Sequence, residues 1–122
     1  MLKDVIQATG IGSVKVIVIA TENIAAFKVA TIKGKNADSA NLLHMGNIAG
    51  VMLGAVATGF AGQAVAEGTI KNSAWTWTIG DVLFLNGTAL STVAPVTGFR
   101  VVIGYAVTAD TIYVDISECI RL

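Results

Sequence analysis

The chain has 122 residues, 54% of them apolar, with 8 basic and 8 acidic side chains and no net charge. It is long enough to bury a core without disulfides, and its single cysteine excludes a disulfide within the chain. The lack of clustered Lys and Arg argues against nucleic-acid binding. Charged residues make up only 13% of the chain, against about 25% in a typical soluble domain, so we expect other subunits to cover much of the surface.

The N-terminal half is predicted to form short strands, because apolar and β-branched residues alternate there with a period of two. The strands expected in this half are residues 14–20, 27–32, 48–56 and 63–70. A helical turn over residues 38–43, capped by Asp38 or Ser39, is expected before the third strand. A turn at residues 58–62 is expected before the fourth strand.

Residues 39–66 contain no charged side chain, and Gly50 and Gly54 within them have the spacing of a helix-dimer face in membranes. A membrane-spanning helix is nevertheless disfavoured, because glycines interrupt the stretch and polar residues such as His44 and Gln63 punctuate it. No basic cluster flanks the stretch to orient such a helix. We therefore expect no membrane partner, and the N-terminus lacks the uninterrupted apolar run of a secretion signal.

The strongest hairpin signal lies in the C-terminal half, where Asn86-Gly87 separates two β-forming runs, residues 81–85 and 88–92. An Asn-Gly pair favours a type I′ turn, in which both central residues have positive φ. The first run is apolar on both faces, with Val82 and Phe84 on one and Leu83 and Leu85 on the other. Such a strand is expected to be buried on both sides, by a second layer or by a neighbouring subunit.

Two further strands are expected at residues 100–107 and 111–116, joined by a turn at residues 108–110. The inward-facing residues of the second are Ile112, Val114 and Ile116. About seven or eight short strands separated by turns indicate an all-β fold, a single-domain antiparallel β-sandwich or barrel. No long helix is expected.

Few residues of the chain suit catalysis. His44 and Cys119 are the only histidine and cysteine, and no third residue is indicated that would orient such a pair. The carboxylates are scattered singly, which indicates neither a metal site nor paired acid–base groups. Gly10 and Gly12 lack the third glycine of a dinucleotide-binding loop. We predict no catalytic, cofactor-binding or metal-binding residues, and no enzymatic activity.

The two tryptophans, Trp75 and Trp77, are the most distinctive pair of candidate functional residues in the sequence. If this segment is a strand, positions i and i+2 point to one face, and the indoles stand side by side. They are expected to pack in the core, under Phe84 or Phe99, or against a neighbouring subunit. A platform for a sugar ring is the alternative function.

This segment carries a resemblance to known proteins. The order Asn72, Ala74, Trp75, Trp77, Gly80 is similar to an Asn-x-Ala-Trp-x-Trp-x-x-Gly segment of tailed-bacteriophage virion proteins. In those proteins the segment leads into a strand that contains Phe or Tyr and then a glycine turn, as residues 81–87 do here. The similarity covers roughly residues 37–122, and the part from Trp75 through Phe84 is the most specific.

The resemblance implies a capsid decoration (cement) protein, a β-rich structural subunit on the outer surface of the virion. Such a protein would bind the major capsid protein at capsomer boundaries and stabilise the head, and it would associate with itself as a homotrimer. The alternative within the same class is a tail-fibre or receptor-binding module that recognises a host surface glycan. Neither kind of protein has catalytic residues or a cofactor whose role could be assigned to residues of this chain.

The interface predicted from this comparison has two parts. Residues 1–12 are interpreted as an N-terminal arm that contacts the capsid, and residues 13–122 as the β-rich domain. The residues expected at subunit or capsid interfaces are Met1, Leu2, Val5, Trp75, Trp77 and Phe84.

Overall fold

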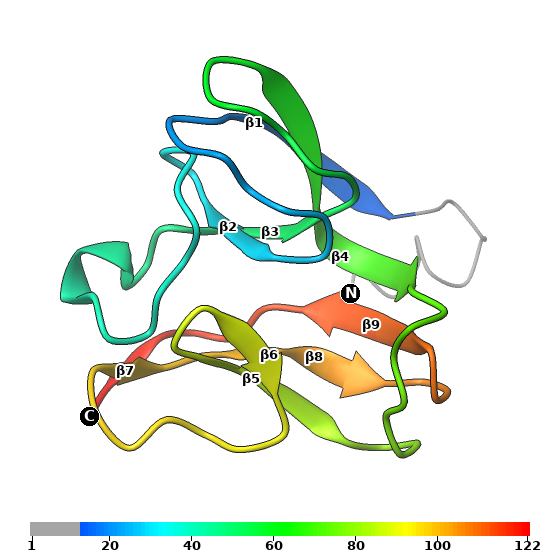
Figure 1. The fold of residues 1–122 in the computed structure, drawn as a ribbon. Helices are drawn as coiled ribbons and strands as arrows, with labels where there is room; N and C mark the ends of the chain where they lie inside the picture. The colour runs from blue at the N-terminus through cyan, green and yellow to red at the C-terminus, as the bar shows by residue number, and fades with distance from the viewer. Residues whose placement is uncertain (1–12) are drawn as a thin grey trace.

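Ten short strands provide nearly all the regular structure of residues 13–122, the part of the chain that this computed structural model describes (Figure 1). The strands are β1 (Val14–Ile19), β2 (Val29–Thr31), β3 (Ile48–Met52), β4 (Ala61–Lys71), β5 (Val82–Asn86), β6 (Ala89–Ser91), β7 (Phe99–Arg100), β8 (Val102–Ala106), β9 (Thr111–Asp115) and β10 (Ile120–Arg121). A single 3-10 turn, η1 (Leu42–His44), is the only helical element in this range.

Strand β4 joins the two halves of the fold. It pairs with β1, β3 and β9, and the main sheet has the order β2-β3-β4-β9-β8-β5-β6 with β1 added on β4. All of these pairings are antiparallel, and β7 pairs with β10 in a separate ribbon. Figure 1 shows β1 to β3 at one end and β5 to β9 at the other, in a nearly closed, barrel-like sheet. The predicted all-β antiparallel fold is confirmed, in its barrel-like form.

The core consists of two apolar clusters, one in each half. The larger is formed by the C-terminal strands together with residues of β2, β3 and β4, and it contains Val29, Ala37, Val51, Val65, Ile70, Leu83, Leu85, Phe99, Val101, Ile103, Ile112 and Val114. The smaller lies beneath β1 and contains Val18, Ala20, Ile24, Ala30, Ala49, Met52, Val56 and Ala64. Because β2, β3 and β4 contribute to both clusters, the two halves share one continuous sheet.

Several predicted strands are shorter than the alternation of residues suggested. Phe27 has a φ of 65°, a left-handed conformation that a strand cannot contain, so β2 begins only at Val29. The expected strand 48–56 ends at Met52, and the charge-free stretch that contains it forms η1, β3 and the start of β4. Among the described residues, no helix has the length and apolar character needed to cross a membrane.

The helical turn forms, but its cap was predicted wrongly. Asn41 caps η1, and its side-chain oxygen accepts a hydrogen bond from the Leu43 N–H at 3.0 Å. Asp38 instead accepts from the Ala40 N–H at 2.9 Å, two residues along, which closes a local turn before η1. Both side chains suit such bonds, and the sequence alone did not decide between them.

The predicted hairpin is present, but its turn is shifted by one residue. Asn86 pairs with Ala89, so Gly87 and Thr88 are the two central residues. Gly87 has a φ of 60°, and neither Asn86 nor Thr88 has a positive φ. This pattern fits a type II′ turn, which needs glycine at its first central position, and the predicted type I′ turn is wrong.

Within the described chain, one of the two apolar faces of β5 is buried, and burial of the other by a neighbouring subunit stays a prediction. Leu83 and Leu85 are fully buried in the larger cluster, whereas Val82 is 45% exposed and Phe84 is only partly buried. The chain therefore supplies one layer against this strand. The other face remains available to a neighbouring molecule.

Replacing Gly104 tests the packing of the central strands. Its Cβ would collide with the backbone carbonyl of Tyr113 on the paired strand β9. We expect Gly104→Ala to lower the free energy of unfolding by about 2 kcal/mol or more, because a backbone atom cannot move aside easily. Urea unfolding followed by circular dichroism measures the change. Gly54→Ala is the matched control, since nothing lies near its Cβ, and an equal loss in both variants would contradict the pairing.

Candidate functional site

Trp75 and Trp77 lie in the connection between β4 and β5, not in a strand as predicted. The backbone N–H of Trp77 donates to the carbonyl of Ala109 at 2.8 Å, which holds this segment against the turn before β9. Both indoles pack against the same core cluster, and their ring centroids are 6.0 Å apart. The predicted side-by-side placement is therefore correct, although the strand is absent.

The two indoles pack against the larger core cluster. Phe27 meets Trp75 edge-on, with ring centroids 5.4 Å apart and an interplanar angle of 66°. This partner was not predicted, because Phe27 is far away in the sequence and adopts a left-handed conformation. Phe99 belongs to the same cluster, whereas Phe84 does not. Core packing thus occupies much of both rings, which weakens the case for a flat sugar platform at this position.

The Trp77 indole has one unsatisfied group. Its Nε1 atom is buried and has no hydrogen-bond partner among the described residues. A buried N–H without an acceptor costs stability, so the contribution of this ring to stability comes from its apolar packing and not from its polar group.

Phe84 belongs to an apolar patch on the outer face of the sheet. It lies opposite Val102 on β8, and Val82 lies opposite Tyr105, so these side chains stand on one surface. Tyr105 is 46% exposed, and its ring centroid is 5.5 Å from that of Tyr113 on β9. The patch therefore extends across three neighbouring strands.

A hollow of about 420 Å³ lies beside Phe84 on this outer face. The lining residues are Phe84, Arg100, Val102, Ser117, Glu118 and Ile120. The hydroxyl of Ser117 accepts a hydrogen bond from the Val102 N–H at 2.9 Å, which fixes the C-terminal segment against β8. Among the described residues, neither Arg100 nor Glu118 is in an ion pair. We name this surface the Phe84 hollow.

Sequence reasoning found Phe84 but missed the rest of the hollow. Val102 was assigned to a strand without a function, and Ile120 lies in β10, which was not predicted. The only signal was the second apolar face of residues 81–85. Pairing across strands brings the other residues to it, and pairing cannot be derived from one sequence.

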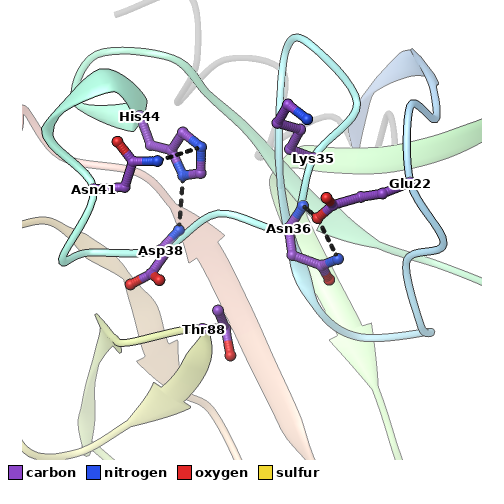
Figure 2. A pocket seen from close by; sticks show the side chains of 7 residues that line it. All are labelled: Glu22, Lys35, Asn36, Asp38, Asn41, His44 and Thr88. Carbon is purple, nitrogen blue, oxygen red and sulfur yellow. Dashed lines mark hydrogen bonds between the residues drawn. The ribbon is translucent and has the colours of Figure 1, made fainter.

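A second hollow is polar and lies between the segment that follows β2 and the β5–β6 hairpin (Figure 2). Its volume is about 590 Å³, and it is lined by Glu22, Lys35, Asn36, Asp38, Asn41, His44 and Thr88. Glu22 accepts two hydrogen bonds from Asn36, from the backbone N–H at 2.9 Å and from the side-chain amide at 2.8 Å. These two bonds, the side-chain bond foremost, hold the pKa of Glu22 below its usual value of 4.5.

His44 is fixed in the same hollow by the backbone. Its Nδ1 accepts a hydrogen bond from the Asp38 N–H at 3.0 Å, so a neutral ring carries its proton on Nε2. The Asn41 amide nitrogen lies 3.4 Å from Nε2. Figure 2 marks this contact with a dashed line, and its direction depends on the tautomer of His44. In the tautomer with the proton on Nε2, this atom is a donor at the hollow.

The remaining candidate residues give little chemistry. Cys119 is partly buried, and its sulfur accepts from the Gly46 N–H at 3.3 Å. Over residues 13–122, no group of three or more His, Cys, Asp or Glu side chains is placed to hold a metal ion. Met1, Leu2 and Val5, which were predicted at an interface, lie outside the described residues.

Comparisons with protein-family models, with curated proteins and with solved structures find no match to this chain. The arguments for its function therefore come from its own residues and their geometry.

Trp77 offers a test of indole packing. We expect Trp77→Ala to reduce the free energy of unfolding by about 3 kcal/mol, because it removes a large side chain from the core cluster. Trp77→Phe keeps a ring and removes the buried N–H, and it is expected to stay within about 1 kcal/mol of the parent protein. Urea titrations measure both. An unchanged unfolding midpoint for Trp77→Ala would refute the packing role.

The lowered pKa of Glu22 predicts a dependence of stability on pH. A carboxyl whose pKa is lower in the folded state stabilises the fold above its ordinary value of 4.5, and this contribution disappears as the pH falls through the folded value. Glu22→Gln removes the titration. The parent protein should therefore lose more stability than Glu22→Gln between about pH 6 and about pH 3. Parallel slopes of the urea midpoint against pH would contradict the Asn36–Glu22 interaction.

Proposed function

We propose that this chain is a virion structural protein that decorates the outer surface of a bacteriophage capsid. It would bind the major capsid protein at capsomer boundaries, with the Phe84 hollow as the contact. The capsid assignment rests on the resemblance of residues 72–87 to virion proteins. The observation that carries the contact surface is an apolar outer face on a chain with few charges: Val82 is 45% exposed and Ile120 52% exposed. Exposed apolar area of this kind marks interaction surfaces.

The rim of the Phe84 hollow would give the contact its orientation. Arg100 and Glu118 carry opposite charges at the edge of an apolar floor. A partner with a matching acidic and basic side chain would neutralise both, while its apolar side chain would enter between Phe84 and Val102. Complementary charge at a rim selects the partner and its register more than it adds affinity.

The proposed mechanism is burial of apolar surface repeated over many equivalent sites. Removing apolar area from water yields about 25 cal/mol per Å², from which the cost of association is subtracted. A weak contact suffices when a subunit touches more than one capsomer, because the second contact forms at high effective concentration. No chemical step is required of the chain, and we propose no enzymatic activity, cofactor or nucleic-acid partner.

The polar hollow favours a second candidate, a tail-fibre or receptor-binding module. Sugar hydroxyls both donate and accept hydrogen bonds, and the hollow offers both kinds of partner: the amide of Asn41, Nε2 of His44 and the carboxylate of Asp38 (Figure 2). Glycan binding would then occur here and not at the two tryptophans. The Phe84 hollow would in that case contact the rest of the fibre.

Copy number separates the two candidates. We expect quantitative mass spectrometry of purified particles to find hundreds of copies of the chain per virion for a decoration protein, and a handful for a fibre module. Absence of the chain from the particles would reject both.

The contact surface is tested by placing a charge in it. Phe84→Glu should abolish binding to capsids that lack the chain, because an unpaired carboxylate would enter an apolar contact. Phe60→Glu is the control, since Phe60 is 67% exposed and lies just before β4, beside the end of β1 and away from the Phe84 hollow. Co-sedimentation with the capsids measures binding. Retained binding of Phe84→Glu, with both variants folded by circular dichroism, would contradict the proposed surface.

A further inference from the structure

Strand β1 lies at an edge of the main sheet. It pairs with β4 from Val14 to Ile19, and no other strand of the described chain pairs with it. An unpaired edge exposes a row of backbone N–H and C=O groups that another strand can bind. The identity of the groups on this edge follows from the bonds at the end of β1.

The backbone groups of alternate residues point to opposite sides of a strand. Ala20 donates to Phe60 at 3.0 Å and accepts from Gly59 at 2.7 Å, so its groups face the side of β4. Thr21 points the other way, because its N–H donates to the Gly34 carbonyl at 2.9 Å. Counting back from Thr21, Ile17 and Lys15 direct their N–H and C=O away from β4.

The register of β4 gives the same result independently. Gln63 lies opposite Ile17, and its carbonyl accepts a hydrogen bond from the Leu53 N–H at 3.0 Å, on the other side of β4. Ile17 and Gln63 therefore do not bond to each other, and the backbone groups of Ile17 face outward. Gly34 lies against the end of β1, next to Ile19 and Thr21. With respect to residues 13–122, the free edge is therefore the part of β1 from Lys15 to Val18.

The side chains of this edge are apolar. Ile17 is 64% exposed and Ile19 is 56% exposed, on the face opposite to Val18, which is buried in the smaller core cluster. Lys15 is the only charged side chain of the strand. Exposed β-branched side chains next to free backbone groups are the features that natural edge strands normally avoid.

The other edges of the main sheet are less available. The outer edge of β2 is covered, since Thr31 donates to Lys35 and Ala37 donates to Val29, both at 2.9 Å. At the far end, β6 contains only Ala89–Ser91. Among these edges, β1 is therefore the one most available for pairing with a further strand.

We propose that β1 pairs with β1 of a second copy of this chain, antiparallel and across a two-fold axis. With Val16 opposite Val16 of the second copy, Lys15 of each strand lies opposite Ile17 of the other. In this register the outward N–H and C=O groups of Lys15 form hydrogen bonds with those of Ile17 in the second copy, and the reverse. The aliphatic stem of Lys15 then covers the exposed Ile17 while its ammonium group reaches water.

A second copy is the occupant because the strand complements itself. Its sequence, Val-Lys-Val-Ile-Val-Ile, has no acidic residue that would attract a basic strand of another protein. In pairing with itself, its single lysine lies opposite an isoleucine, which avoids repulsion between like charges. An antiparallel pair of identical strands forms a closed two-fold interface, which does not grow into a filament. The pairing leaves the Phe84 hollow uncovered, so this inference does not depend on the proposed function.

The test uses the position whose N–H points away from β4. Ile17→Pro removes only the outward donor and leaves the β1–β4 hydrogen bonds intact, as prolines on edge strands do. Sedimentation equilibrium of the parent protein should give twice the 12.6 kDa of one chain. Ile17→Pro and Ile17→Lys should both give the mass of one chain, whereas the conservative Ile17→Val should remain a dimer.

Circular dichroism and the thermal midpoint establish that the variants are folded; if Ile17→Pro unfolds, Ile17→Lys alone decides. Phe84→Glu is the control on the other surface and should remain a dimer. A monomeric parent protein would overturn the proposal, as would the homotrimer that the resemblance to decoration proteins implies, or a folded Ile17→Lys that keeps the dimeric mass. Loss of capsid binding by Phe84→Glu with the dimer retained would separate the two surfaces.

Discussion

The pairing along both edges of β4 is the interaction on which the rest of the domain depends. Glu67 lies opposite Val14 on one side and opposite Asp115 on the other, so the N-terminal and C-terminal halves meet on this strand. The absence of a side chain at Gly68 lets Ser13 approach the strand closely, where a Cβ would collide with it. Without β4, the sheet would separate into β9-β8-β5-β6 and the two-stranded β2-β3 pair, and β1 would lose its only partner among the described strands. A two-stranded pair is at best marginally stable alone.

A sheet that closes nearly on itself can bury only one face of each strand. The apolar residues on the inner faces fill the two clusters, and those on the outer faces remain exposed, as at Ile17 and Val82. This division connects the low charge of the chain to its surfaces. The Phe84 hollow and the β1 edge lie on different strands, so the two proposed contacts, one with a capsid and one with a second copy, would not compete for the same surface.

Local sequence predicted most of the fold. Alternation placed β1, β4, β5, β8 and β9 close to their observed positions, because a period of two is itself the geometry of a half-buried strand. The errors fell where the conformation of single residues mattered. Phe27 has a left-handed conformation that no local rule predicts for an aromatic residue. The hairpin turn is centred on Gly87 and Thr88 and not on the predicted Asn86-Gly87 pair.

The sequence by itself determined the class of the fold, the scarcity of charge and the second apolar face of β5, since composition and periodicity are local properties. The tertiary structure decided which apolar residues stayed outside. It placed Trp75 and Trp77 against Phe27, gathered Val102 and Ile120 around Phe84, and directed the backbone of Ile17 away from β4. These outcomes depend on strand order and register, which arise from contacts between residues far apart in the chain.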